Sequence, residues 1–154
     1  MPLMIDLQVV ATDGQIPEQQ KFQLWADAAG VACGVDHREL TIRVTDEKES
    51  ADLNESYRHK TGSTNVLSFP FEDPPGVDTA ILGDLVICAP VVQREAIEQG
   101  KTAEAHWAHM LVHGVLHLCG FDHLHEREAD EMEMLETDII TGLGYPPPYN
   151  DYSK

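Results

Sequence analysis

The sequence contains few basic residues, few cysteines and no long hydrophobic run. Against 27 Asp and Glu it carries only 10 Lys and Arg, which gives a formal net charge of −17 at pH 7 with His neutral. So acidic a chain is not typical of proteins that bind nucleic acids through many phosphate contacts. The three cysteines are scattered and odd in number, which argues against a disulfide framework and fits a reducing compartment.

No stretch is long and apolar enough to span a membrane, and residues 1–6 contain neither a basic segment nor a long apolar run. We therefore expect a cytoplasmic protein with no membrane partner. A chain of 154 residues is long enough to bury a full hydrophobic core without disulfide or metal staples. We predict one domain at residues 1–145, followed by a polar, proline-rich and loosely ordered tail at residues 146–154.

The hydrophobic periodicity predicts four strands and five helices in the order β-α-β-α-β-β-α-α-α. This order indicates an α+β domain, in which a small mixed β-sheet packs against helices. Within the second helix, Leu53 and Tyr57 are expected on the side that faces the core. The strands are expected at residues 5–10, 39–44, 64–69 and 82–88, and the helices at residues 18–29, 46–58, 90–99, 102–118 and 125–143.

One segment departs from the acidic character of the chain. Residues 56–71, which begin with Ser56 and the basic run Tyr57-Arg58-His59-Lys60, contain no Asp or Glu, whereas acidic residues are concentrated at 126–138. The segment is either a binding face or a strand with its lead-in loop. Charge alone does not decide between these two interpretations.

Three histidines follow a spacing that is typical of a metal site. His113 and His117 are four residues apart, so on a helix their side chains lie one turn apart on the same face. Gly120 can adopt a positive φ and end that helix, so that the chain turns and brings His123 back toward the other two. Three imidazoles with one position open for water form the ligand set of a catalytic zinc site. The pattern H-x-x-x-H-x-x-G-x-x-H therefore predicts a metzincin-like metal site on a buried central helix.

One position departs from the metzincin pattern. Those peptidases carry a general-base glutamate directly after the first His, where this chain has Gly114. Cys119 could close the site as a fourth protein ligand of a structural metal, or it could be an ordinary small buried thiol. We favour the open, catalytic type of site.

Other residues near the motif each have two interpretations. Arg58 could bind phosphate through its planar fork, or it could be a surface cation at the C-terminus of a helix. Asp84 and Asp122 could orient a ligand or act as a base, or they could merely stabilise a strand end and a turn. His109, one turn before His113, could line the cleft or be a side chain with its hydrogen bonds satisfied.

Four segments together point to a known family. They are His-Gly-x-Leu-His-Leu-x-Gly-x-Asp-His at residues 113–123, Tyr-Arg-His-Lys at 57–60, Thr-Asn-Val-Leu-Ser-Phe-Pro at 64–70 and Gly-Asp-Leu-Val-Ile at 83–87. These segments resemble the YbeY family of bacterial endoribonucleases, and the resemblance covers nearly the whole chain. It implies a single-strand-specific, metal-dependent endoribonuclease that acts in the maturation of the 3′ end of 16S rRNA and in ribosome quality control.

Carried over residue by residue, the resemblance implies one Zn²⁺ ion per chain with His113, His117 and His123 as ligands. It also implies a functional role for Arg58. The implied partners are single-stranded rRNA and the ribosome or its small-subunit proteins, with no DNA. Phe121 stands where the family more often has Tyr, so any contribution of that hydroxyl to orienting a ligand or substrate would be absent here.

Two other functions stay open on the residues alone. One is a zinc metallopeptidase that lacks the usual Glu base and takes its base from elsewhere, such as Asp122 or Glu126. The other is a non-catalytic, zinc-stabilised module that binds the ribosome. Both rank below the nuclease. The peptidase does so because Gly114 cannot move a proton and a ribose alkoxide leaves more readily than an amide nitrogen.

Overall fold

Among residues 2–12, 16–35, 37–121 and 126–149, which the computed structural model describes, four strands form one sheet. The strand order is β1-β2-β4-β3, in which β1, β2 and β4 run parallel and β3 runs antiparallel to β4. This mixed sheet with its helices confirms the predicted α+β class. The strands are β1 (Met4–Val9), β2 (Glu39–Thr45), β3 (Val66–Pro70) and β4 (Ile81–Cys88), and the helices are α1 (Gln19–Cys33), α2 (Glu47–Arg58), α3 (Ala89–Glu98), α4 (Ala103–Leu118) and α5 (Glu126–Gly142).

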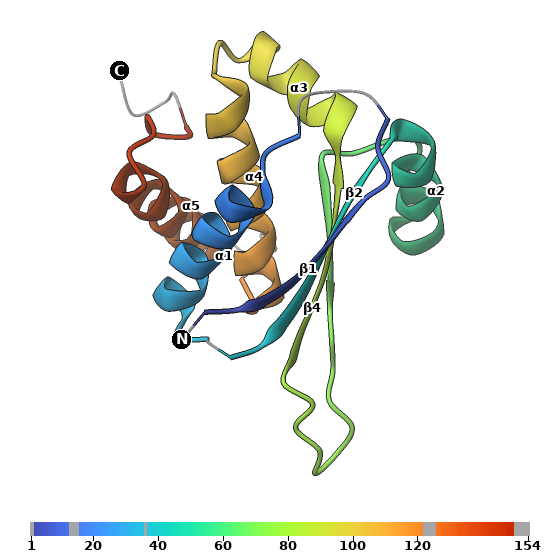
Figure 1. Cartoon of the computed structure of the whole chain (residues 1–154), viewed down its shortest axis with the longest axis vertical. Helices are drawn as coiled ribbons and strands as arrows, with labels where there is room; N and C mark the ends of the chain where they lie inside the picture. The colour runs from blue at the N-terminus through green and yellow to red at the C-terminus, as the bar shows by residue number, and fades with distance from the viewer. Residues whose placement is uncertain (1, 13–15, 36, 122–125, 150–154) are drawn as a thin grey trace.

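The helices are distributed unequally over the two faces of the sheet. Figure 1 shows α1, α4 and α5 on one side of the sheet and α2 on the other. The alternation in β2 buries Leu40, Ile42 and Val44, while the apolar run of β4 is buried along most of its length, as expected for a central strand. The covered face of the sheet therefore supplies one side of the core.

Helix α4 lies at the centre of this core. It contacts α1, α3 and α5 as well as β3 and β4, and most of its side chains are buried. Its sequence is apolar around much of the helix, as a helix enclosed on several sides requires. The orientation of any functional side chain on α4 is consequently set by packing against several elements.

Two local expectations were wrong. Helix α1 continues through Gly30 to Cys33 and ends at Gly34, which has φ 72°. A Cβ at Gly30 would lie 3.3 Å from a methyl carbon of Leu3. Gly30 therefore lets Leu3 pack closely against the helix, and it does not end the helix.

In α2, the buried residues are Ser50 and Asn54, and the Tyr57 side chain is 65% exposed. The Ser50 hydroxyl donates to the carbonyl of Thr64, and the Asn54 amide donates to the carbonyl of Gly62. The inner side of α2 is thus polar because it binds the backbone of the segment that leads into β3.

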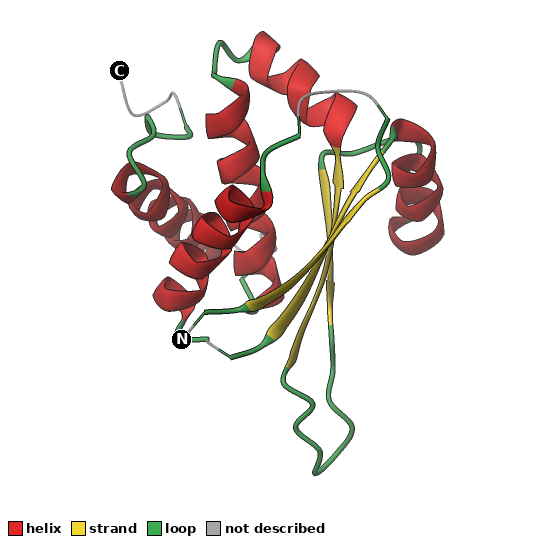
Figure 2. Ribbon diagram, in the orientation of Figure 1, coloured by secondary structure: helices red, strands yellow, loops and turns green. Residues whose placement is uncertain are grey.

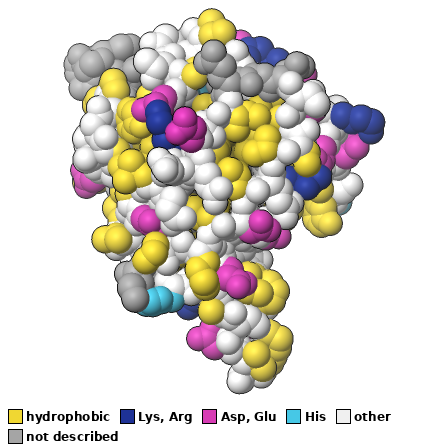
Figure 3. Space-filling view, in the orientation of Figure 1, with side chains coloured by type: hydrophobic (Ala, Val, Ile, Leu, Met, Phe, Trp, Pro, Cys, Tyr) yellow, Lys and Arg dark blue, Asp and Glu magenta, His cyan; other side chains and the backbone are white. Residues whose placement is uncertain are grey.

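The surface has two features that bear on binding. The loop between β3 and β4 projects away from the sheet (Figure 2), and its residues 71–78 are exposed. On the face shown in Figure 3, Lys and Arg side chains lie apart from one another and do not form one basic patch.

In the described part of the chain, no helix is long and apolar enough to cross a membrane.

Candidate metal centre

Both ends of helix α4 are defined by local interactions. At its N-terminus, the Thr102 side chain accepts a hydrogen bond from the amide of Ala105 at 3.1 Å, which satisfies one of the unpaired donors of the first turn. At its C-terminus, Gly120 has φ 106° and its amide donates to the carbonyl of His117. The helix therefore ends where the sequence predicted, directly after the two histidines.

His113 and His117 lie one turn apart on α4 with their imidazoles facing each other. Their ring centroids are 4.6 Å apart, and the two Nε2 atoms are separated by 3.0 Å. Two nitrogens at about 2.0–2.1 Å from one tetrahedral zinc ion would be about 3.3 Å apart, so this arrangement suits a shared metal ion with little adjustment. The predicted third ligand, His123, and the neighbouring Asp122 lie outside the described residues.

A buried carboxylate lies behind His113. Glu136 of α5 is fully buried, and its Oε1 atom accepts a hydrogen bond of 2.8 Å from Nδ1 of His113. Its Oε2 atom accepts hydrogen bonds of 2.6 Å from Nε2 of His109 and 2.6 Å from the hydroxyl of Tyr149. Potential ligand atoms of His109, His113 and Glu136 lie within 4.8 Å of one another, so this group could hold a metal ion.

The electrostatics of this group follow from burial and hydrogen bonding. Burial by itself would raise the pKa of Glu136, but the hydrogen bonds from His109 and His113 outweigh it and lower the pKa to about 2. Burial lowers the pKa of His109 in spite of its hydrogen bond to Glu136. At neutral pH, the centre therefore contains a charged carboxylate that accepts hydrogen bonds from His109 and His113.

Glu136 and Tyr149 were not among the residues predicted from the sequence. A signal for Glu136 was present, because residue 136 follows Met132 by four residues and precedes Ile139 and Ile140 on the buried side of α5. A carboxylate in an apolar helical stripe needs a partner. For Tyr149, which was assigned to the tail, the sequence offered no comparable signal.

The two facing imidazoles open into a cavity of about 340 Å³. Arg58, in the last turn of α2, lines the same cavity, so segments more than fifty residues apart in the sequence meet there. None of the described lining residues is acidic, although the chain as a whole is. The lining residues are Arg58, Thr64, Asn65, Val66, Ser68, His113 and His117.

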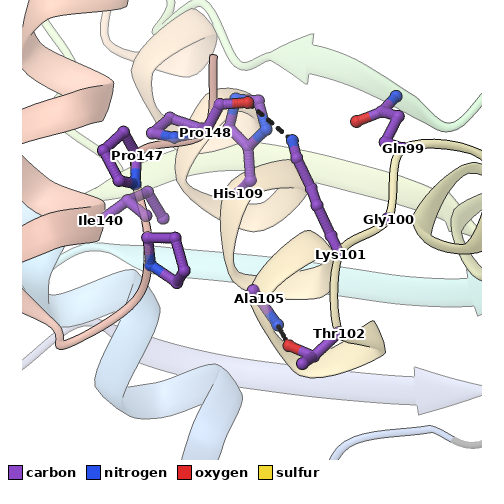
Figure 4. A pocket seen from close by; sticks show the side chains of 10 residues that line it. Gln99, Gly100, Lys101, Thr102, Ala105, His109, Ile140, Pro147 and Pro148 are labelled. Atoms are coloured by element: carbon purple, nitrogen blue, oxygen red, sulfur yellow. Dashed lines mark hydrogen bonds between the residues drawn. The ribbon is translucent and has the colours of Figure 1, made fainter. Parts of the chain in front are cut away.

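Three other candidates lie elsewhere. Asp84 lines a separate cavity, together with Arg43 and Tyr57, on the side of the sheet where α2 lies. His109 does not line the cavity of His113 and instead borders a cavity nearer the N-terminal end of α4, together with Thr102 and Ala105 (Figure 4). Its hydrogen bond to Glu136 satisfies one ring nitrogen.

Cys119 is directed at another cysteine. Its thiol forms a hydrogen bond with Cys33 of α1, which raises the pKa of Cys119 and lowers that of Cys33. A thiol that contacts α1 in this way is an ordinary packed side chain. The structure therefore does not favour Cys119 as a fourth metal ligand.

Gly114, at the position of the metzincin base, faces the sheet. A Cβ at this position would lie 2.7 Å from Cδ2 of Leu85 and 3.3 Å from Cγ2 of Val66. The hydroxyl of Ser68 also donates to the carbonyl of Gly114 at 3.3 Å, which holds β3 close to the helix. A side chain at residue 114 would therefore require Leu85 to move.

Comparisons with known proteins identify the family and support the fold. The sequence profile of one family, described as Endoribonuclease YbeY, matches residues 11–144. Among solved structures, the solution structure of TM1509 from Thermotoga maritima is similar, with a TM-score of 0.59 and 21% sequence identity over 99% of each chain. At this identity, the structural likeness supports the fold alone, whereas the profile match covers most of the chain, including Arg58, His113 and His117.

Proposed function

Because this chain belongs to the YbeY endoribonuclease family, we propose that it is a metal-dependent endoribonuclease specific for single-stranded RNA. It acts in the maturation of the 3′ end of 16S rRNA and in ribosome quality control in the cytoplasm, with rRNA and small-subunit ribosomal proteins as partners. The observation that carries the proposal is that Arg58 lines one cavity together with His113 and His117.

The proposed metal is one Zn²⁺ ion, with His113, His117 and His123 as its ligands. The separation of 3.0 Å between the Nε2 atoms of His113 and His117 supports the first two ligands, and His123 rests on the sequence motif. A zinc ion bound there would supply a positive centre that activates water and polarises a phosphate oxygen.

Arg58 is proposed to bind the scissile phosphate. Its guanidinium is always charged and presents paired donors that match two phosphate oxygens. The absence of acidic residues from the described lining supports this role, because a neighbouring carboxylate would compete for the guanidinium and repel the substrate. The hydroxyls of Thr64 and Ser68 line the same cavity and can contribute hydrogen bonds to RNA.

The peptidase alternative is less well supported. Peptide hydrolysis at such a site needs a carboxylate near the metal to carry the proton to the leaving amine. Gly114 faces Leu85 of the sheet, and the described lining of the cavity contains no carboxylate. A phosphodiester can be cleaved with electrostatic stabilisation as the main contribution, which Arg58 supplies.

The proposal is tested by incubating the Zn²⁺-loaded protein with a labelled single-stranded RNA, with the same RNA as a duplex, and with casein. We expect cleavage of the single strand only, and its loss in His113→Ala. His37→Asn is the matched control, because His37 is exposed, does not line the cavity and has φ 56°, a conformation that Asn tolerates.

Each contrary result points to a different conclusion. RNA cleavage that persists in His113→Ala would overturn the proposal, since the activity would then come from another site or a contaminant. Degradation of casein that depends on His113 would restore the peptidase alternative. No cleavage of either substrate by a folded, Zn²⁺-loaded protein would favour the non-catalytic ribosome-binding module.

A further inference from the structure

The three hydrogen bonds to Glu136 determine how two histidines carry their protons. A carboxylate only accepts hydrogen bonds, so each partner must donate to it. His109 donates through Nε2, whereas His113 donates through Nδ1. An imidazole that binds a metal ion carries one proton, and with that proton on Nδ1 the Nε2 atom of His113 presents its lone pair, 3.0 Å from Nε2 of His117.

The C-terminal segment completes this arrangement. The carbonyl of Pro148 accepts a hydrogen bond of 2.7 Å from Nζ of Lys101, just before α4 (Figure 4). Pro148 is buried, and the next residue, Tyr149, donates its hydroxyl to Glu136 and contacts the ring of His109 at a centroid distance of 5.2 Å. Residues 146–149, which the sequence suggested as part of a loose tail, thus contribute a donor to the centre.

We propose that Glu136 is a positioning residue that holds His113 as its Nδ1-protonated tautomer and so prepares its Nε2 atom to bind the metal, with Tyr149 fixing the carboxylate. This inference rests on the proposed function in so far as His113 is a metal ligand there. Partners of this kind raise the basicity of a ligating imidazole and fix its orientation, and their loss typically weakens metal binding by about 10–100-fold.

The alternative to positioning is that Glu136 itself coordinates the metal, because it belongs to a group that could hold a metal ion. In the described structure its two oxygens accept hydrogen bonds from His109, His113 and Tyr149. A carboxylate with both oxygens engaged by donors is arranged to orient a ligand. Hydrogen bonds already use three of the about four acceptor sites of this carboxylate.

The experiment measures Zn²⁺ affinity by competition with a coloured chelator for the wild type, Glu136→Gln and Tyr149→Phe. Glu95→Gln is the matched control, since Glu95 also accepts a hydrogen bond of 2.9 Å from Nε2 of a histidine on α4, His106. We expect about 10–100-fold weaker binding for Glu136→Gln, a loss below about tenfold for Tyr149→Phe, and no change beyond about twofold for the control.

Two spectroscopic readouts separate positioning from a structural role. In metal-free protein, long-range ¹H–¹⁵N correlation spectra should show His113 as the Nδ1-protonated form in the wild type, with the Nε2-protonated form appearing in Glu136→Gln. In Co²⁺-loaded protein, the visible absorption bands of Glu136→Gln should match those of the wild type, because the ligands are unchanged.

The proposal is overturned if Glu136→Gln keeps wild-type Zn²⁺ affinity and the wild-type tautomer, even with a lower melting temperature. Altered Co²⁺ bands in this variant would identify Glu136 as a ligand and would equally overturn it. If Glu136→Gln does not fold, Tyr149→Phe replaces it as the test, because that change removes one hydroxyl and leaves Glu136 and both histidines in place. Wild-type Zn²⁺ affinity together with the wild-type tautomer of His113 in Tyr149→Phe would then overturn the proposal. None of these readouts uses RNA, so failure of the nuclease activity is distinguishable from failure of this inference.

Discussion

A Cβ atom on Gly114 would lie 2.7 Å from Cδ2 of Leu85, closer than two carbon atoms can approach without movement. The residue after the first histidine of the motif is therefore a contact between helix α4 and strand β4. Its lack of a side chain permits this contact. In a metzincin the corresponding position carries the catalytic base. Here the histidines keep the same spacing, but the residue after the first one, Gly114, serves helix packing.

Gly114→Ala is expected to destabilise the protein, although alanine favours helices more than glycine does. Overpacking against Leu85 costs about 1–3 kcal/mol, of which the gain in helix propensity offsets about 1 kcal/mol. The free energy of unfolding from urea titrations measures the difference. Gly142→Ala is the control, because Gly142 also lies in a helix but has no atom within 4 Å of the added Cβ, and it should unfold at equal or higher urea. A more stable Gly114→Ala variant would contradict the packing argument.

Arg58→Ala is expected to lower kcat/KM for single-stranded RNA by about 100-fold or more, the scale found when a group that stabilises transition-state charge is removed. Arg58→Lys should recover part of the activity, because lysine keeps the charge but not the planar fork. Stability should hardly change, since Arg58 is exposed.

The control for Arg58 is Arg94→Ala. Arg94 is another exposed arginine, which pairs with Glu47 at 3.0 Å and does not line the cavity of His113. Equal loss of activity in the two variants would indicate a general effect of positive charge on RNA binding. Activity in Arg58→Ala close to that of the wild type would remove Arg58 from the proposed mechanism.

Removal of the metal with a chelator should abolish RNA cleavage but leave the fold intact. The buried core includes Trp25, Ile42, Leu85 and Leu111, residues on four different elements, and it does not depend on the metal centre. We expect an unchanged far-ultraviolet circular dichroism spectrum and a lower melting temperature that added Zn²⁺ restores, as linkage requires. Collapse of the helical signal on chelation would instead favour a metal-stabilised binding module.

The contribution of Glu95 to stability should depend on pH. Burial by itself would raise the pKa of Glu95, but hydrogen bonds from His106 and Asn65 outweigh it, so the pKa is lowered on folding. A group with a lowered folded pKa stabilises the protein above its unfolded pKa of about 4.3 and loses this contribution as the pH falls through the folded value. Urea unfolding of Glu95→Gln and the wild type should therefore differ most at pH 6–7, roughly, and less near pH 3. A difference that grows on acidification would contradict this sign.

Some of these features could be predicted from local sequence. The four-residue spacing of His113 and His117 determines that they share a helical face, because that geometry lies within one element. The alternation of Leu40, Ile42 and Val44 likewise predicted a strand with one buried side, and the structure confirms it. The family was also identifiable, since its motif consists of contiguous residues.

Other features depend on how separate elements pack. The sequence of α5 does not specify that Glu136 contacts His113 and His109 on α4, because that pairing requires a particular register between two helices. Nor does the motif specify that Gly114 faces Leu85. Periodicity gives the orientation of side chains around one helix, whereas the distance to a partner on another element follows only from the packed core. The sequence by itself determined the candidate ligands His113 and His117, and the tertiary structure decided which groups surround them.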